Sequence, residues 1–226
     1  MEVKSNDFVE IEYDMYANGK LVQTTDKKKA ESAGMKVDEV LSSQILIIGR
    51  SVILKALDDD IIEKQSLKEE HLELEPEKAY GIRKKDMLKV LPKSAFEEHK
   101  TRPLVGVVYD FNGMYGTVKS VIGGRILVDF NSPLAGKKIS IDYKVLSKVD
   151  NIAKKIEVVN TIFLTLPTDS FNVKIDENND KQIILSIPEQ LVQMKDLFMK
   201  SYEEIIPDFK DYTLKIEKFK NQQKHE

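Results

Sequence analysis

The sequence predicts an α+β protein in three parts, on three observations. Residues 8–16, "FVEIEYDMY", alternate apolar and polar side chains with the period of a half-buried strand. Residues 51–64 place apolar side chains at helical spacing. Beyond residue 150, apolar helical patterns flank two strand-like runs, "FNVKID" and "QIILSI". We therefore expect an antiparallel sheet on a short helix, a small inserted β module, and a C-terminal domain of order α-β-β-α-β.

The first part reads as a sheet with one helix. Asn18-Gly19 supplies a tight hairpin turn after the first strand. A polar surface segment over 26–39 follows, and then the strand "QILIIG". In the helix predicted over 51–64, we expect Asp58, Asp59 and Asp60 to form a solvated face. A charged strand over 67–74 ends this part before the corner Ala79-Tyr80-Gly81.

The middle of the chain contains short strand-like runs separated by glycine-containing turns. The run "VGVVYDFNGMYGTVKSVIGGRILVDF" predicts three short strands, joined at Asn112-Gly113 and at Gly123-Gly124. The next segment, "LVDFNSPLAGK", ends one apolar run, turns at Asn-Ser-Pro and starts another alternating run. Its proline fixes φ and its glycine lacks a Cβ, so we expect a corner that directs the chain into a new strand.

The C-terminal part begins with a helix for which Asp150 is the expected cap. A second helix, opened by Pro188, carries an apolar stripe that includes Leu197, Phe198 and Tyr202. Two interpretations of this stripe are open, a core face or the interface of a homodimer, and the spacing favours the core.

Composition excludes several classes of function. Lys and Arg number 35 and Asp and Glu 38, giving a formal charge of −3, which disfavours nucleic acid and anionic membranes as partners. Neither a membrane-spanning run nor a signal-peptide core is present in the sequence, and there is no cysteine. The histidines show no metal-ligand spacing. We expect a cytoplasmic protein without a metal or cofactor.

Four segments together resemble FKBP-type peptidyl-prolyl cis-trans isomerases. They are "FVEIEYDMYANGKLVQTTD", "IIGRSVILKALDDDI", "EPEKAYG" and "LVDFNSPLAGKKISIDYKV". The similarity is to the slyD-like subclass, which has a domain inserted in the flap, and to long archaeal members with a C-terminal domain. The resemblance implies an isomerase domain over 1–81 and 128–149, an insert-in-flap chaperone domain over 82–127, and a C-terminal domain over 150–226.

The resemblance also implies a substrate pocket. Tyr80 and Tyr13 are its expected catalytic residues, and Tyr80 directs its hydroxyl toward the substrate. The remaining walls and floor of the pocket are expected to be Val22, Gln23, Leu46, Ile53, Leu54, Leu57 and Ile141. Crossing the barrier to rotation about an X-Pro bond requires loss of amide resonance, about 18 to 20 kcal/mol, with no proton transfer. A mostly apolar pocket that fits the twisted amide better than the planar forms lowers that barrier.

This chain departs from the family's pattern inside the pocket. The family commonly has Phe-Asp at Val22-Gln23 and an aromatic residue at Ile141. Loss of ring surface and of a charge predicts low activity or a shifted substrate range. Two functions therefore stay open, an isomerase that also acts as a folding chaperone, and a non-catalytic holdase that has kept the fold.

The insert carries more apolar surface than so small a module can bury. In the resembling family this domain holds unfolded chains, so the expected partners are unfolded or proline-containing polypeptides. The side chains expected to contact them are Met87, Leu88, Leu91, Phe111, Met114 and Tyr115. Methionine suits such contacts because its flexible side chain adapts to many shapes.

Overall fold

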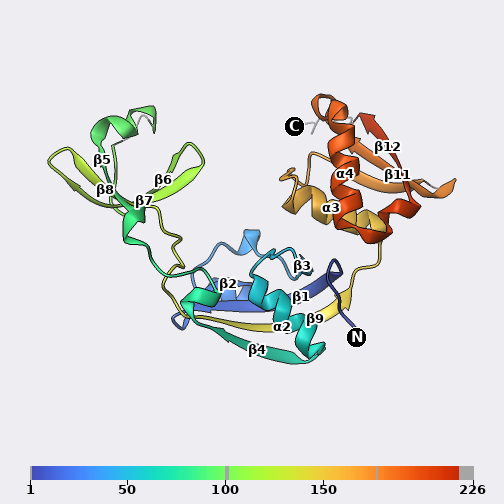
Figure 1. Cartoon of the computed structure of the whole chain (residues 1–226), viewed down its shortest axis with the longest axis horizontal. Helices are drawn as coiled ribbons and strands as arrows, with labels where there is room; N and C mark the ends of the chain where they lie inside the picture. The colour runs from blue at the N-terminus through green and yellow to red at the C-terminus, as the bar shows by residue number, and fades with distance from the viewer. Residues whose placement is uncertain (1, 100–101, 177, 219–226) are drawn as a thin grey trace. The chain divides into compact units, whose positions relative to one another are not determined.

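The computed structural model describes residues 2–99, 102–176 and 178–218 (Figure 1). It contains helices and mainly antiparallel sheets, so the prediction of a mixed α+β protein is confirmed. By its internal contacts the chain forms two compact units, 1–14 with 23–72 and 142–226, and 15–22 with 73–141. We describe each unit by itself.

The first sheet has the strand order β2-β1-β9-β4, with β3 paired to β1. Its strands are β1 (Phe8–Ala17), β2 (Lys20–Thr24), β3 (Gln44–Ile47), β4 (Glu69–Leu74) and β9 (Ile139–Lys148). β1 and β3 run antiparallel, with Val9 opposite Leu46. Helix α2 (Lys55–Lys64) begins later than the predicted helix, because the chain from Gly49 to Leu54 forms a loop that contains two positive φ angles.

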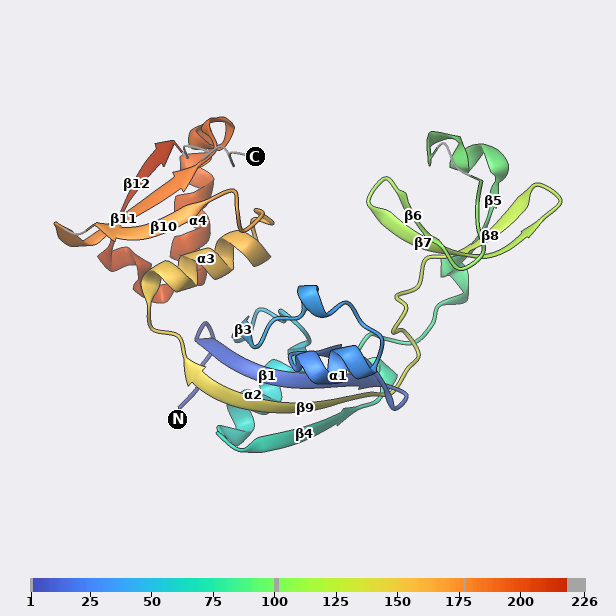
Figure 2. The same ribbon diagram turned by 180° about the vertical axis from the view of Figure 1, so that it is seen from behind.

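A short helix that the sequence analysis did not predict lies between β2 and β3. Helix α1 (Lys27–Ser32) is drawn over β1 in Figure 2, and a 3-10 turn (Val37–Glu39) follows it. Its N-cap is Asp26, whose carboxylate accepts from the backbone N–H groups of Lys28 and Lys29. The helix is fixed to β1 by the ammonium of Lys29, which pairs with Asp14. The polar composition of 26–39 concealed this element.

In the second unit, the chain folds into a four-stranded sheet of order β5-β8-β7-β6. Strands β6 (Val108–Phe111), β7 (Met114–Ile122) and β8 (Arg125–Asp129) are joined at the two predicted turns, and β5 (Leu88–Pro92) adds an edge strand that was not predicted. The 3-10 turns Lys85–Met87 and Lys93–His99 flank β5. The core consists of Phe96, Tyr109, Val118, Ile126, Val128 and Phe130.

Two connecting segments join this four-stranded sheet to the rest of its unit, and they are paired with each other. Asn131 acts as a substitute backbone, since its Oδ1 accepts from Lys84 N at 2.8 Å and its Nδ2 donates to Lys84 O at 3.0 Å. The buried carboxylate of Asp129 pairs with Arg83. Gly136 N donates to Gly81 O at 2.8 Å, with Gly136 at φ 74°. The corner "LVDFNSPLAGK" is therefore the return half of a paired connection.

The described residues from 150 to 218 form two helices, three strands and two 3-10 turns. In chain order these are α3 (Ile152–Ile162), β10 (Asn172–Asp176), β11 (Asn179–Ile187), a 3-10 turn (Glu189–Met194), α4 (Lys195–Ile205), a further 3-10 turn (Pro207–Asp211) and β12 (Thr213–Lys218). β11 pairs antiparallel with β10 and parallel with β12. The cap of α3 is Asn151, not Asp150 as predicted, because the Asn151 side chain reaches Lys154 N at 3.0 Å.

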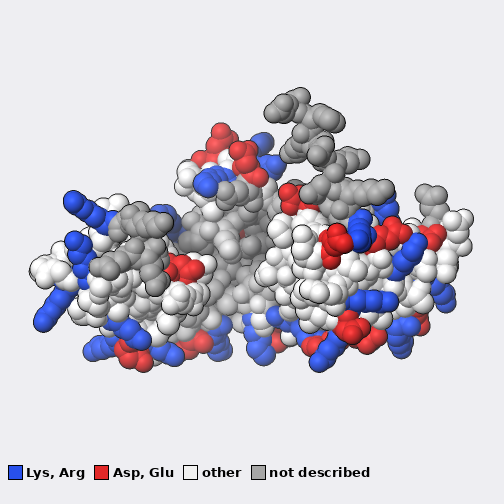
Figure 3. All heavy atoms as spheres, turned by 90° about the horizontal axis from the view of Figure 1, so that it is seen from above, with Lys and Arg blue, Asp and Glu red and all other residues white. Residues whose placement is uncertain are grey.

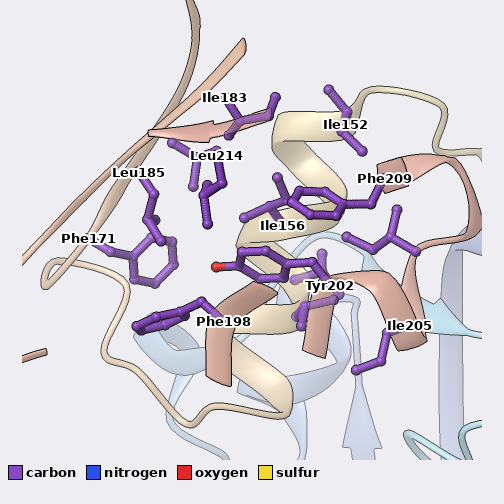
Figure 4. Close-up of a cluster of buried hydrophobic side chains, with 14 of the residues drawn as sticks. Ile152, Ile156, Phe171, Ile183, Leu185, Phe198, Tyr202, Ile205, Phe209 and Leu214 are labelled. Carbon is purple, nitrogen blue, oxygen red and sulfur yellow. The ribbon is translucent and has the colours of Figure 1, made fainter. Parts of the chain in front are cut away.

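One hydrophobic cluster fills the C-terminal domain and extends into the first sheet. Figure 4 shows Ile156 of α3 among Phe198, Tyr202 and Phe209. Phe8 of β1 and Ile47 of β3 belong to the same cluster, and Val52 packs against it. Hydrophobic packing therefore joins this domain to β1, β3 and the loop before α2.

The apolar stripe of α4 divides in the structure. Phe198 and Tyr202 are buried, as the core interpretation predicted, and Tyr202 donates to Asn160 Oδ1 at 2.5 Å. Met194 and Leu197 are exposed. The described residues contain no helix long and apolar enough to cross a membrane.

Candidate functional site

The predicted pocket residues divide between the two units. Tyr13, Gln23, Leu46, Ile53, Leu54 and Leu57 belong to the first unit, and Val22, Tyr80 and Ile141 belong to the second. Leu46, Leu57 and Ile141 are fully buried and Leu54 nearly so. Tyr13, Val22, Ile53 and Tyr80 are half-buried, and Gln23 is exposed. The half-buried side chains are therefore the ones that both pack against the protein and have surface accessible to a ligand.

Tyr13 is fixed through its backbone. Its N–H donates to Thr25 Oγ1 at 2.9 Å, and Thr25 N donates back to Tyr13 O at 3.0 Å. The next residue, Asp14, is buried and accepts from the hydroxyl of Thr24 and from Lys29 of α1. The buried carboxylate is stabilised by both contacts, which hold the start of α1 against β1 beside Tyr13.

The loop from Gly49 to Leu54 carries two of the predicted floor residues, and Asp58 fixes it from within. Asp58 is only 1% exposed. Its Oδ2 accepts from Gly49 N at 2.8 Å and from Ser51 N at 2.9 Å, and no hydrogen-bond partner is described for its Oδ1. Burial raises the pKa of this carboxyl, and the two backbone hydrogen bonds oppose that effect. The prediction that Asp58 lies on a solvated face is wrong.

The reason for that error is local. Helical periodicity places Asp58 beside Leu57 and Ile61, which are both buried, so its face is not the solvent face. The loop bends back over this position, with Gly49 at φ 86° and Ser51 at φ 53°. The cluster Asp58-Asp59-Asp60 is thus split, because Asp60 also has a structural contact: its Oδ2 accepts from the hydroxyl of Tyr143 at 2.6 Å.

Tyr80 is the most informative member of the second unit. Its hydroxyl donates to the sulfur of Met15, and the oxygen–sulfur distance is 3.6 Å. A thioether is a weak acceptor, so a carbonyl oxygen can replace it at little cost. Burial raises the pKa of the Tyr80 phenol, which therefore stays protonated at neutral pH. Tyr80 can thus donate a hydrogen bond to a peptide carbonyl.

In the four-stranded sheet of the second unit, the six residues predicted to contact unfolded chains differ in exposure. Met114 is 49% exposed and Tyr115 67%, and Leu88 is also exposed. Met87, Leu91 and Phe111 pack instead against the core of this sheet. The sequence analysis did not select further exposed apolar residues of the same region, which are Val90, Leu104, Val105, Val107, Val108, Val121 and Ile122.

Strand alternation could have revealed part of this surface. Tyr109 and Phe111 share one face of β6, so Val108 must lie on the other. Gly116 of β7 also marks the inner face, because a Cβ there would lie 2.5 Å from a methyl carbon of Val128. Its neighbour Tyr115 consequently points away from the core.

We found no metal site among the residues that the structure describes, since no three histidine or acidic side chains there are grouped to hold an ion. His71 contacts Asp142 at 2.5 Å. His225 lies outside the described residues. Acidic and basic side chains are both spread over the face drawn in Figure 3.

Comparisons with known proteins found one family model and several relatives that match parts of this chain. Residues 89–134 match the family model described as FKBP26, IF domain. The chain is 25% identical over 144 residues to the short-type peptidyl-prolyl cis-trans isomerase of Methanocaldococcus jannaschii, a match that covers 63% of this chain and 92% of that protein. The chain is thus similar to FKBP-type peptidyl-prolyl cis-trans isomerases, and its residues 89–134 are similar to an insert-in-flap domain.

Two bacterial FKBP-type relatives match over shorter lengths. The chain is 31% identical over 117 residues to the FKBP-type peptidyl-prolyl cis-trans isomerase SlyD of Helicobacter pylori, covering 48% of this chain and 63% of that one. It is 32% identical over 78 residues to the FKBP-type 16 kDa peptidyl-prolyl cis-trans isomerase of Escherichia coli (strain K12), covering 32% of this chain and 52% of that protein. The chain therefore spans under two thirds of both bacterial FKBP-type relatives.

The role of Asp58 can be tested by substitution. Asp58→Ala leaves the N–H groups of Gly49 and Ser51 without their acceptor, and we expect it to lower the free energy of unfolding by about 1–3 kcal/mol. Asp58→Asn retains an oxygen acceptor and removes the buried charge. Urea unfolding of both variants and the wild type would measure these effects.

The pH dependence of stability shows whether burial raises the pKa of Asp58. Because the pKa of Asp58 is higher in the folded than in the unfolded state, the folded state binds this proton more tightly. Asp58 therefore adds stability as pH falls from neutral toward the unfolded value of 3.8. We expect the wild type to gain stability relative to Asp58→Asn over that range, and a difference independent of pH would contradict the assignment.

Proposed function

We propose that the protein catalyses cis-trans isomerisation of X-Pro bonds in unfolded or nascent polypeptides, and that its insert holds those chains. Support comes from the observation that Tyr80, in the Ala79-Tyr80-Gly81 corner, presents a protonated hydroxyl whose described acceptor is only a thioether sulfur. The named activity of the three relatives adds to it. The absence of cysteine fits a reducing, cytoplasmic setting.

Catalysis in this proposal works by differential binding. The residues that the family resemblance assigns to contacts with the prolyl ring and the residue before it are Tyr13, Val22, Ile53, Leu54 and Ile141. Tyr80 donates to a substrate carbonyl and holds the peptide in position. A site of this kind leaves little water around the amide, which favours the twisted form, whose charge separation is smaller than that of the planar amide.

The deeply buried members act mainly through packing. Leu46 and Leu57 are fully buried, so they support Ile53 and Leu54 from below. Gln23 contributes no fixed charge, and its exposed side chain contacts the flanking part of the peptide. Val22 and Ile141 are smaller than the family's aromatic residues, and so a larger residue before proline fits this pocket better than in relatives with aromatic walls.

Substitution of Tyr80 tests the isomerase proposal. We expect Tyr80→Phe to lower kcat/KM for an Ala-Leu-Pro-Phe peptide by about threefold to tenfold, the range of one net hydrogen bond. The wild-type rate should stay constant between about pH 6 and about pH 9, because the Tyr80 phenol stays protonated and no other proton moves. Exchange NMR on the peptide measures both.

Two outcomes would contradict this assignment. A Tyr80→Phe variant as active as the wild type would remove the hydroxyl from the mechanism. A wild type that leaves peptide exchange unchanged, yet still prevents aggregation of an unfolded protein, would favour the non-catalytic holdase, for which the exposed apolar surface of the insert is the supporting observation.

The insert is proposed to bind unfolded chains through Met114, Tyr115 and Leu88. We expect the double substitution Met114→Ser, Tyr115→Ser to weaken suppression of aggregation of a reduced, unfolded protein by about fivefold. Peptide isomerisation should not change. Leu41→Ser is the matched control, because Leu41 is equally exposed but lies outside the insert. Equal loss in the control and the double variant would show nonspecific adhesion.

A homodimer through the C-terminal domain stays a proposal that depends on two exposed side chains, Met194 at the end of the 3-10 turn before α4 and Leu197 of α4. Sedimentation equilibrium should then show a dimer at micromolar concentration and a monomer for Leu197→Glu. A wild-type monomer would remove the proposal.

A further inference from the structure

The loop from Gly49 to Leu54 is held from outside as well as from within. Arg50 projects from it and contacts two other segments of the same unit. Its Nε donates to Asn6 Oδ1 at 3.3 Å, its Nη1 to Glu204 Oε1 at 3.0 Å, and its Nη2 to Glu204 O at 2.9 Å. One side chain therefore links the N-terminal segment, this loop and the end of α4.

The contact with α4 is favourable for a reason specific to that helix. Glu204 is the penultimate residue of α4, so its carbonyl is one of the four at the helix end that lack an intrahelical partner. The helix has no basic residue of its own in its last turn. Arg50 supplies both the missing donor and the positive charge that the C-terminal end of a helix dipole attracts.

Successive residues of the loop contact different partners, the C-terminal domain and Asp58 of α2. Arg50 and Val52 contact the C-terminal domain, Val52 by packing against its hydrophobic cluster. Gly49 and Ser51 are bound by Asp58. Ile53 and Leu54, the proposed floor residues, follow immediately. A displacement of the loop at residues 50 and 52 must therefore move the backbone of residue 53, since three peptide units separate it from residue 50 and one from residue 52.

We propose that Arg50 is a positioning residue through which the C-terminal domain holds the substrate-floor loop in its active conformation. The proposal rests on the proposed isomerase function, and it gives the C-terminal domain a role in catalysis without direct contact with the substrate. Helix α4 acts as a fixed anchor, Arg50 as the link, and Ile53 and Leu54 as the parts whose position determines the fit to the twisted amide.

The test uses full-length variants with Arg50→Ala, Arg50→Lys, Glu204→Ala and the double change. Lys154→Ala is the matched control, since Lys154 makes a surface ion pair with Glu157 on α3 and has no contact with the loop. We expect Arg50→Ala to lower kcat/KM for the tetrapeptide about twofold to tenfold, and Glu204→Ala less, because its backbone carbonyl remains. The double variant should match Arg50→Ala, and Arg50→Lys should restore part of the rate.

Hydrogen exchange supplies the second readout. The amides of residues 51–54 should exchange faster in Arg50→Ala and Glu204→Ala, with no change in the core of α3. Unchanged exchange in this loop would overturn the proposal, as would kcat/KM in Arg50→Ala equal to that of the Lys154→Ala control. If the wild type shows no isomerisation, the isomerase proposal and the catalytic role of Arg50 both fail, and the exchange data still show separately whether Arg50 fixes the loop.

Discussion

The carboxylate of Asp58 and the loop that it binds are the constraint on which the proposed substrate floor depends. A chain that leaves β3 at Ile47 must turn within a few residues and enter α2 with Leu54 and Leu57 facing inward. Two positive φ angles make that turn. The turn takes the N–H groups of Gly49 and Ser51 out of the regular hydrogen bonds of a strand or helix, so they need another acceptor. Placing an acidic residue in the first turns of α2 satisfies both of them and is also favourable at a helix N-terminus. The cost is a buried charge, which appears as the raised pKa.

A second constraint follows from the insert. A chain that leaves the host sheet after β4 must return to form β9, and the two connecting segments have few side chains to bury. Polar contacts replace a core there, with Asn131 pairing to the backbone of Lys84 and Asp129 to Arg83. The apolar side chains lie instead in the four-stranded sheet. In its small core, Phe111 packs edge to face against Phe96 and Phe130, while Met114 and Tyr115 stay exposed. In the proposed function, catalysis and chain binding therefore depend on different residues.

Much of this fold could be predicted from the sequence because periodicity and turn residues report local structure. The strands around Asn112-Gly113 and Gly123-Gly124 and the helices in the C-terminal part are examples. Helix α1 was missed because its segment is polar and shows no apolar helical stripe, and the contact between Lys29 and Asp14 that fixes it to β1 has no local sequence signal. Asp58 was misjudged as exposed for a related reason. Its burial depends on the loop that contains Gly49 and Ser51, whose N–H groups it binds.

The candidate site was predictable to a smaller extent. Family resemblance supplied the order of Tyr13, Ile53 and Tyr80 along the chain, whereas the contacts that fix them were visible only in the structure. The partner of the Tyr80 hydroxyl is a methionine 65 residues away, and Arg50 binds a helix end 154 residues away. Contacts of such separation have no sequence signal in a single chain.

In the proposed function, one chain joins an isomerase site to a surface that captures its substrate. The most direct measurement is the ratio of wild-type kcat/KM values for two substrates. One is an unfolded protein whose refolding is limited by one X-Pro bond, and the other is a tetrapeptide that contains the same X-Pro pair. Capture by the insert raises the effective concentration of that bond at the site, so we expect a ratio of about a hundred or more. A ratio near one would contradict it, since the insert would then contribute nothing to the turnover of unfolded chains.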